Sequence, residues 1–271
     1  MTIQTLPHPI DGLAAVAADY DVLLCDVWGV IHNGREHFAP ALDALIRFRD
    51  GGGKVVLISN APRPSQAVVS QLDSLGVPRT AWDAFVTSGD ATRAELGRRA
   101  PGPVWALGPD RDMPLYEGTG VAVADGPKDA RFICCTGLYD DTTEQPQDYR
   151  EALSKAAAAD LEMVCANPDR VVQRGDQLIY CAGSLADLYE TLGGRVTMAG
   201  KPFGPIYDLA MKEAEALLGA NGQGLDCLFV AAGIHGATAQ GPDGRVDAEK
   251  AGELLKAETT YARYTMLDLA W

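Results

Sequence analysis

Three groups of polar residues follow predicted strands and could act together on a phosphoryl group. Asp26 follows one apolar run, Ser59 and Asn60 end another, and Lys201 lies in a turn before a predicted helix. Because ligands of an open parallel sheet bind beyond the carboxyl ends of its strands, we expect these residues at one rim. An aspartate can attack phosphorus as a nucleophile, while a hydroxyl and an ammonium neutralise the transferring group.

Each of these residues also has an ordinary structural explanation. An aspartate after a strand commonly caps a helix or forms a turn, and a Ser-Asn pair is common in turns. A single lysine is usually solvated. The combination of the three groups, and not any one of them, therefore carries the inference.

The elements that must position these residues are short apolar runs that alternate with helical patterns. This alternation predicts an α/β fold with parallel strands. The first predicted elements lie at residues 21–26, 40–49, 54–59, 65–75, 85–87 and 91–99. Ser65 is expected to cap the second helix and Gly76 to end it. The stretch 89–195 has an alternation of its own, which predicts a second, smaller α/β unit inserted into the first.

The chain resembles the haloacid dehalogenase (HAD) superfamily in three motifs that follow one another in the family's order. They are Asp26-Val27-Trp28-Gly29-Val30, Leu57-Ile58-Ser59-Asn60-Ala61 and Gly200-Lys201-Pro202. The insert between the second and third motifs looks like a C2-type cap, nearest to class IIA and its nitrophenylphosphatase-like members. The resemblance implies a Rossmann-like open parallel sheet core of residues 1–88 and 196–271, with a cap domain of residues 89–195.

The second and third motifs imply phosphate-binding roles. By resemblance, Ser59 would hydrogen-bond the phosphate with Asn60 beside it, and Lys201 would neutralise the charge and orient the nucleophile. Within the insert, the run from 165 to 169 is similar to the Asn-Pro-Asp element of class IIA caps. Asn167 and Asp169 would therefore face the cleft from the cap as substrate-side residues.

The first motif implies the nucleophile and part of a metal site. Asp26 would attack phosphorus and bind Mg²⁺, with the backbone carbonyl of Trp28 as a second ligand. HAD phosphatases usually carry a second aspartate, the general acid and base, at the position of Trp28. The loss of a general acid removes roughly 10²–10⁴ in rate, least for aryl and acyl phosphates. His32 could substitute for it or be a simple turn histidine, and chemistry at carbon or at a phosphonate stays open.

The fourth motif of the family, an acidic Gly-Asp-x-x-x-Thr-Asp element, is missing. The helix through Leu218 runs directly into the glycine-rich stretch 219–224, so about 20 residues are absent by usual element sizes. Either the sequence omits residues that the protein has, or the protein lacks a strand and its acidic loop. Asp226 precedes the next predicted strand and is expected at the opposite rim, which leaves Asp26 as one carboxylate for Mg²⁺.

Composition and charge limit the classes of partner. The 271 residues carry 23 Lys and Arg against 37 Asp and Glu, which gives a net charge of −14. Because such a surface repels phosphate backbones, we expect no nucleic-acid partner. No signal peptide and no run of roughly 18 apolar residues is found, so no membrane association is expected. The six cysteines lack metal-ligand spacing and predict a cytoplasmic protein, while a homo-oligomer is left open.

The sequence therefore predicts a cytoplasmic, Mg²⁺-dependent HAD hydrolase that acts on a small phosphorylated metabolite through an aspartyl-phosphate on Asp26. A cap that closes over the cleft would exclude water and select the substrate. The alternative is a HAD-fold protein that binds a phosphorylated ligand or a partner with little or no turnover. Trp28 and the missing acidic motif are the reasons for that alternative.

Overall fold

The computed structural model describes residues 6–174, 177–218, 228–230, 240–241, 243, 245–257, 262–266 and 268–271. The chain forms two compact units. Unit 1 comprises Met1–Leu57, Leu72–Ala84 and Met211–Trp271, and unit 2 comprises Ile58–Gln71 and Phe85–Ala210. These limits differ from those of the predicted core and cap domains, whose boundaries after residues 88 and 195 stay a prediction.

Unit 2 is built on a five-stranded parallel sheet with the order β11-β8-β7-β5-β6. Its strands are β5 (Val104–Leu107), β6 (Val123–Ala124), β7 (Phe132–Cys135), β8 (Glu162–Cys165) and β11 (Arg195–Met198). The helices around it are α3 (Ser88–Arg99), α4 (Arg150–Ala158) and α5 (Ala182–Thr191). The sheet confirms that the inserted stretch forms a second α/β unit.

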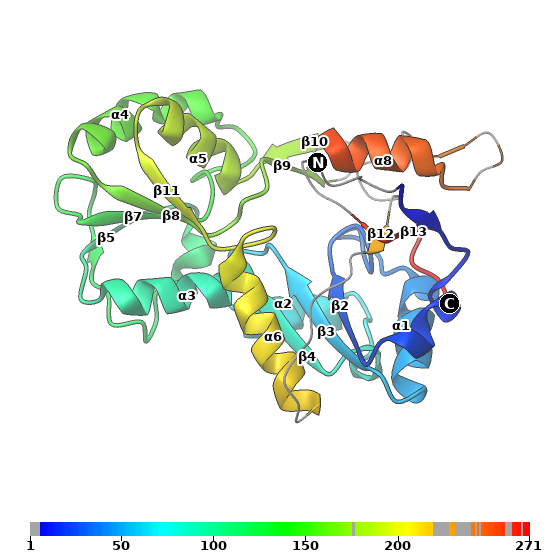
Figure 1. The fold of residues 1–271 in the computed structure, drawn as a ribbon. Helices are drawn as coiled ribbons and strands as arrows, with labels where there is room; N and C mark the ends of the chain where they lie inside the picture. Colours follow the sequence, from blue (N-terminus) through cyan, green and yellow to red (C-terminus); the bar gives the residue numbers. More distant parts are fainter. Residues whose placement is uncertain are drawn as a thin grey trace. The chain divides into compact units, whose positions relative to one another are not determined.

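Side chains of β7 alternate between two buried clusters on the two faces of this sheet. Ile133 and Cys135 belong to a cluster that includes residues of α4 and α5. Phe132 and Cys134 belong to a second cluster that includes Leu96 of α3. Figure 1 shows the same arrangement, with α4 and α5 over one face and α3 over the other. This period of two, with both faces covered, is the pattern of a buried parallel strand.

The carboxyl edge of this sheet carries two of the predicted site segments on neighbouring strands. Met198 at the end of β11 is in register with Cys165 at the end of β8. The backbone N–H of Ala199 donates to the carbonyl of Cys165 at 3.0 Å, so the pairing continues one residue further. The segment before Lys201 and the segment before Asn167 therefore leave the sheet side by side.

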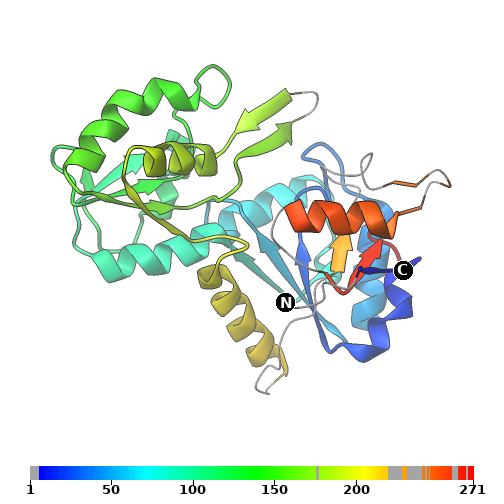
Figure 2. The ribbon, with the colours of Figure 1, turned by 45° about the horizontal axis from the view of Figure 1, so that its top comes forward.

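A β-hairpin in unit 2 was not predicted from the sequence. It pairs β9 (Val171–Arg174) with β10 (Gln177–Tyr180) in antiparallel fashion. Leu178 on this hairpin is exposed. The hairpin begins two residues after Asp169 and returns the chain to α5 (Figure 2).

Unit 1 contains the strands that begin and end the chain. One sheet has the order β2-β3-β4 and another the order β1-β13-β12, whose pairs are parallel. The strands are β1 (His8–Pro9), β2 (Val22–Asp26), β3 (Lys54–Ser59), β4 (Ala84–Thr87), β12 (Leu228–Val230) and β13 (Tyr264–Met266). Residues 58–59 of β3 and residues 85–87 of β4 belong to unit 2, so this sheet is divided between the two units. The predicted strands at 21–26, 54–59 and 85–87 are therefore confirmed.

The remaining helices are α1 (Ala39–Asp50), α2 (Ser65–Ser74), α6 (Gly204–Leu218) and α8 (Ala248–Ala257). The first two begin and end close to their predicted limits, and α8 was not predicted from the sequence. Gly76 has a φ of 74°, the left-handed conformation that ends a helix, as predicted. Ser65 is the first residue of α2 and not its cap, which corrects the prediction. No helix in the described ranges is both long and apolar enough to cross a membrane.

Candidate active site

Asp26 is the last residue of β2 in unit 1 and is exposed. The apolar residues before it form the strand, and the polar aspartate ends it. The backbone N–H of Val27 donates to Oδ1 of Asp26 at 2.7 Å, which orients the carboxylate. The thiol of Cys25 donates to the Asp26 carbonyl at 3.1 Å. A strand end with an oriented, solvent-accessible carboxylate is a suitable position for a nucleophile.

The turn after Asp26 places Trp28 and His32 on adjacent backbone segments. Gly29, with a φ of 78°, forms the turn, and its N–H donates to the His32 carbonyl at 2.8 Å. The His32 ring is buried, and its Nδ1 accepts a hydrogen bond from the Gly34 N–H at 2.9 Å. Burial lowers the pKa of His32, although the negative charge of Asp26 acts in the opposite direction. Because Nδ1 accepts the hydrogen bond from Gly34, the neutral His32 ring carries its proton on Nε2.

Ser59 and Asn60 stand at the end of β3, in unit 2. Ser59 is the last residue of the strand and is buried. Its hydroxyl oxygen accepts a hydrogen bond from the Ala61 N–H at 3.2 Å, a local turn. Asn60 follows in the loop, and its side-chain amide reaches two distant segments of the same unit, those of Asp169 and Lys201.

Lys201 is held against the end of β3 by its backbone and by its side chain. Its N–H donates to Oδ1 of Asn60 at 2.7 Å, and its carbonyl accepts from Nδ2 of Asn60 at 3.1 Å. Its Nζ donates to the Ile58 carbonyl at 3.1 Å. The ammonium group of Lys201 thus lies at the strand end that carries Ser59, as the motif order predicts.

The Asn-Pro-Asp element forms a turn that presents Asp169 to Asn60. Oδ1 of Asn167 accepts a hydrogen bond from the Asp169 N–H at 3.0 Å, so this side chain stabilises its own turn. Oδ1 of Asp169 accepts from Nδ2 of Asn60 at 2.8 Å. A Cβ at Gly183 would lie 2.2 Å from the Pro168 carbonyl oxygen, so glycine permits the close approach of α5 to this turn.

The structure thus brings together Asn60, Lys201 and Asp169 within unit 2, with Ser59 next to Asn60 in the chain. Asn167 supports the turn beside them. Asp26 and Trp28 belong to unit 1. A common site that unites Asp26 with Ser59 and Lys201 remains a prediction from the motifs.

Residues at the start of α3 and its N-cap, which the sequence analysis did not single out, hold the loop after Asn60. The Gly89 N–H donates to the Ala61 carbonyl at 3.0 Å, and the Thr87 hydroxyl donates to the Arg63 carbonyl at 2.8 Å. Thr87 and Asp90 also form a capping box at the start of α3. The spacing Thr-x-x-Asp before a helix is the signal that could have found them.

Acidic, histidine and cysteine side chains do not gather into a metal-binding group of three or more anywhere in the described residues. Asp226 and the glycine-rich stretch 219–224 lie outside the described part of the chain. The five described cysteines are buried free thiols. Burial raises the pKa of Cys134 and of Cys165 to about 12, which keeps both protonated and inert at neutral pH.

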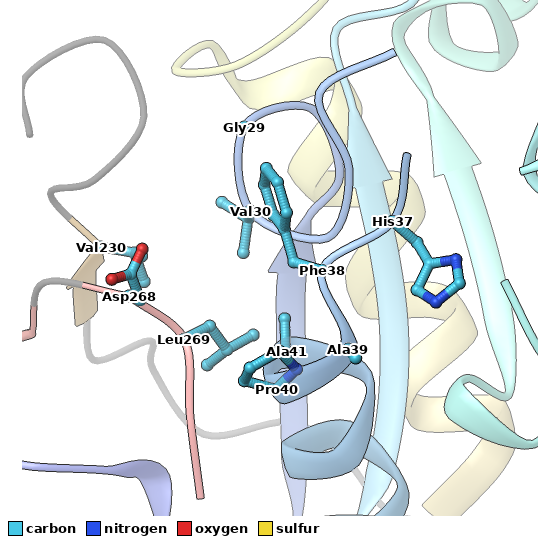
Figure 3. A pocket seen from close by; sticks show the side chains of 10 residues that line it. All are labelled: Gly29, Val30, His37, Phe38, Ala39, Pro40, Ala41, Val230, Asp268 and Leu269. Atoms are coloured by element: carbon cyan, nitrogen blue, oxygen red, sulfur yellow. The ribbon is translucent and has the colours of Figure 1, made fainter. Parts of the chain in front are cut away.

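A pocket of about 370 Å³ lies in unit 1 beside the turn that follows Asp26. Figure 3 shows Val30, Phe38 and Leu269 around it, with the Asp268 carboxylate at one side. The full lining set is Gly29, Val30, His37, Phe38, Ala39, Pro40, Ala41, Val230, Asp268 and Leu269. None of these residues is a predicted site residue, and a largely apolar wall does not suit a phosphate group.

A family model and a solved structure are similar to this chain. A family model described as haloacid dehalogenase-like hydrolase matches residues 23–122. A crystal structure of a haloacid dehalogenase-like family hydrolase from Brucella suis 1330 is 40% identical, with a TM-score of 0.80. The match covers 89% of this chain and 96% of that chain.

More distant similarities extend to enzymes with named activities. A D-glycerol 3-phosphate phosphatase of Mycobacterium tuberculosis is 26% identical over 240 residues, 83% of this chain and 67% of that protein. A crystal structure of a glycerol phosphate phosphatase from the same species, in complex with magnesium, is 22% identical (TM-score 0.63; 87% and 78% covered). A p-nitrophenyl phosphatase from Archaeoglobus fulgidus is 17% identical (TM-score 0.66; 91% and 95% covered). The M. tuberculosis magnesium complex and the A. fulgidus structure share the fold of this chain.

Proposed function

The chain belongs to the haloacid dehalogenase-like hydrolase family, and we propose that it is a Mg²⁺-dependent phosphatase of a small phosphorylated metabolite. Asp26 is the proposed nucleophile. The observation that carries the proposal is the position of Lys201, whose ammonium group is held at the end of β3 beside Ser59. A fixed cation next to a hydroxyl is suited to the spread negative charge of a transferring phosphoryl group.

In the proposed reaction a carboxylate oxygen of Asp26 attacks phosphorus, and the bond from phosphorus to the leaving oxygen breaks. The product is an aspartyl-phosphate and an alcohol or phenol, which takes a proton from water. A water molecule then attacks the phosphorus of this intermediate, which releases inorganic phosphate and restores the carboxylate. Lys201 and Ser59 stabilise the charge on the phosphoryl oxygens in both steps.

The proposed metal site has a small set of ligands. Mg²⁺ is usually bound by one or two carboxylates together with substrate phosphate oxygens and water. The Asp26 carboxylate and the Trp28 carbonyl would hold the ion, and when bound it would neutralise phosphate charge. The magnesium complex of the glycerol phosphate phosphatase from M. tuberculosis supports this choice of metal.

The experiment that tests the proposal measures hydrolysis of p-nitrophenyl phosphate with and without Mg²⁺, in the wild type and in Asp26→Asn. We expect Mg²⁺-dependent activity that falls on the order of 10³-fold or more in the variant. Asp43→Asn removes an exposed carboxylate on α1 that pairs with Arg47, and serves as the matched control with unchanged activity. Equal activity in Asp26→Asn and the wild type would refute the nucleophile assignment.

A second candidate function is the binding of a phosphorylated ligand without efficient turnover. It is favoured by the small ligand set at Asp26 and by the lack of a three-residue metal-binding group within the described residues. Calorimetric titration with inorganic phosphate separates the two candidates. Saturable phosphate binding without Asp26-dependent hydrolysis would favour the second candidate, whereas Asp26-dependent turnover would exclude it.

A further inference from the structure

The side-chain amide of Asn60 forms hydrogen bonds with two residues that lie more than 100 positions further along the chain. Its oxygen accepts from the Lys201 N–H at 2.7 Å. Its nitrogen donates to the Lys201 carbonyl at 3.1 Å and to the Asp169 carboxylate at 2.8 Å. A carboxamide has two N–H hydrogens, so neither is left to donate to a phosphate group.

Asp169 and the backbone of Lys201 both select the same orientation of this amide. A carboxylate only accepts hydrogen bonds, so it selects the nitrogen of Asn60 and turns the oxygen toward the Lys201 N–H. In the flipped amide, oxygen would face the Asp169 carboxylate and the NH₂ group would face the Lys201 N–H. Both contacts would then be repulsive, and the charge-assisted bond to Asp169 makes the observed orientation the stable one.

The segment that contains Lys201 is packed closely against the same amide. A Cβ at Gly200 would lie 2.6 Å from Oδ1 of Asn60, and equally close to the Pro168 ring and the Ser88 hydroxyl. Only a residue without a side chain allows Lys201 to reach Asn60 in this way. Since Nζ of Lys201 also donates to the Ile58 carbonyl, both ends of the lysine are fixed on the segment Ile58–Asn60.

We propose that Asp169 and Asn60 are positioning residues that act through Lys201, rather than groups that touch the substrate. Asp169 orients the Asn60 amide, the amide fixes the backbone of Lys201, and the backbone sets where the ammonium group can lie. This inference rests on the proposed function of Lys201. It also revises the sequence-based roles, in which Asn60 bound phosphate and Asp169 faced the substrate.

The kinetic test uses p-nitrophenyl phosphate with Mg²⁺. We expect Asp169→Ala and Asn60→Ala to lower kcat by up to about 10²-fold, because a displaced cation stabilises the transition state less well. KM should stay within about twofold. Asp169→Asn keeps an oxygen that can accept from Asn60 and should restore most of kcat. Asp187→Asn, which removes an exposed carboxylate paired with Arg170, is the matched control with unchanged kcat.

A background variant distinguishes action through Lys201 from direct action. In Lys201→Met the ammonium group is gone, so adding Asp169→Ala should lower kcat little further. A further loss as large as that in the wild-type background would overturn the proposal. The proposal would also be overturned if Asp169→Ala raised KM for glycerol 3-phosphate and left KM for p-nitrophenyl phosphate unchanged, because that pattern indicates a contact with the substrate.

A measurement without turnover separates this proposal from the proposed function. Hydrogen exchange followed by NMR or mass spectrometry reports the Lys201 N–H, which is protected by Asn60. We expect faster exchange at Lys201 in Asn60→Ala and Asp169→Ala, and unchanged exchange in Asp187→Asn. Unchanged exchange in both alanine variants would overturn the positioning role, whether or not the wild type hydrolyses phosphate esters. If exchange changes but Asp26 proves dispensable, the proposed function fails and the structural link stands.

Discussion

The carboxylate of Asp90 accepts a hydrogen bond from the backbone N–H of Ser65 at 3.1 Å, which joins the first turns of α3 and α2. The second oxygen of Asp90 accepts from the backbone N–H of Thr87 at 3.0 Å. One carboxylate thus serves two helix N-termini, where negative charge is stabilising. Because Ser65 ends the loop that starts at Asn60, Asp90 fixes the far end of that loop.

The first prediction follows from this double role of Asp90. Asp90→Ala removes a capping box and the link to Ser65 together, so the free energy of unfolding should fall by about 1–2 kcal/mol. Urea unfolding monitored by circular dichroism measures the change. Glu117→Ala, which removes an exposed carboxylate from the same unit, should change the free energy little. Equal losses in the two variants would contradict the assigned role of Asp90.

Two glycines of α3 give the second prediction. A Cβ at Gly89 would lie 2.3 Å from the carbonyl carbon and oxygen of Arg63, so Gly89→Ala forces the loop after Asn60 to move. A Cβ at Gly97 would meet no atom within 4 Å. Gly97→Ala should therefore stabilise the protein by about 0.5–1 kcal/mol through helix propensity. Gly89→Ala should destabilise it and lower activity, and thermal unfolding of both variants tests the contrast.

Much of the fold was predictable because its strands are apolar runs bounded by polar or glycine residues. Local composition was sufficient to predict β2, β3 and the start of α1 near Pro40. The start of α3 was placed three residues too late, because Ser88 and Gly89 are weak helix formers and only the cap at Thr87 reveals them. The strand β13 was missed because its three residues pair with β1 and β12, and such long-range pairing leaves little local signal.

The candidate site was predictable in its residue types but not in its hydrogen bonds. The motifs indicated that Ser59, Asn60 and Lys201 belong together, and the structure brings Asn60 and Lys201 into direct contact. Local sequence could not show that Asn60 is shared between Lys201 and Asp169. These contacts span 141 and 109 residues and depend on which strands of the unit 2 sheet are neighbours.

The third prediction concerns the pH dependence of stability. Burial lowers the pKa of His32 in the folded state, so the unfolded chain binds a proton more readily than the folded protein does. The resulting stability is present above the ordinary pKa of about 6.5 and is lost as the pH falls toward the folded-state pKa. The free energy of unfolding should therefore decrease from pH 7.5 to pH 5.5.

His32→Asn offers a side-chain oxygen where Nδ1 accepts from the Gly34 N–H, but does not titrate in this range. It should make the free energy of unfolding less dependent on pH between these two values. His8→Asn changes an exposed histidine in the same unit and serves as the control for replacing a histidine with asparagine. An unchanged slope in His32→Asn would show that His32 does not carry the effect.

The last prediction concerns the leaving group, because Trp28 stands where the motif of HAD phosphatases has a general acid. An indole cannot protonate a departing alkoxide, so p-nitrophenyl phosphate should be hydrolysed far faster than glycerol 3-phosphate. Trp28→Asp should raise kcat for glycerol 3-phosphate by roughly 10²-fold or more and change the nitrophenyl reaction little. Trp28→Asn, which removes the same indole without supplying an acid, is the control for altered packing. Similar wild-type rates on the two substrates would mean that another group of the protein already supplies the proton.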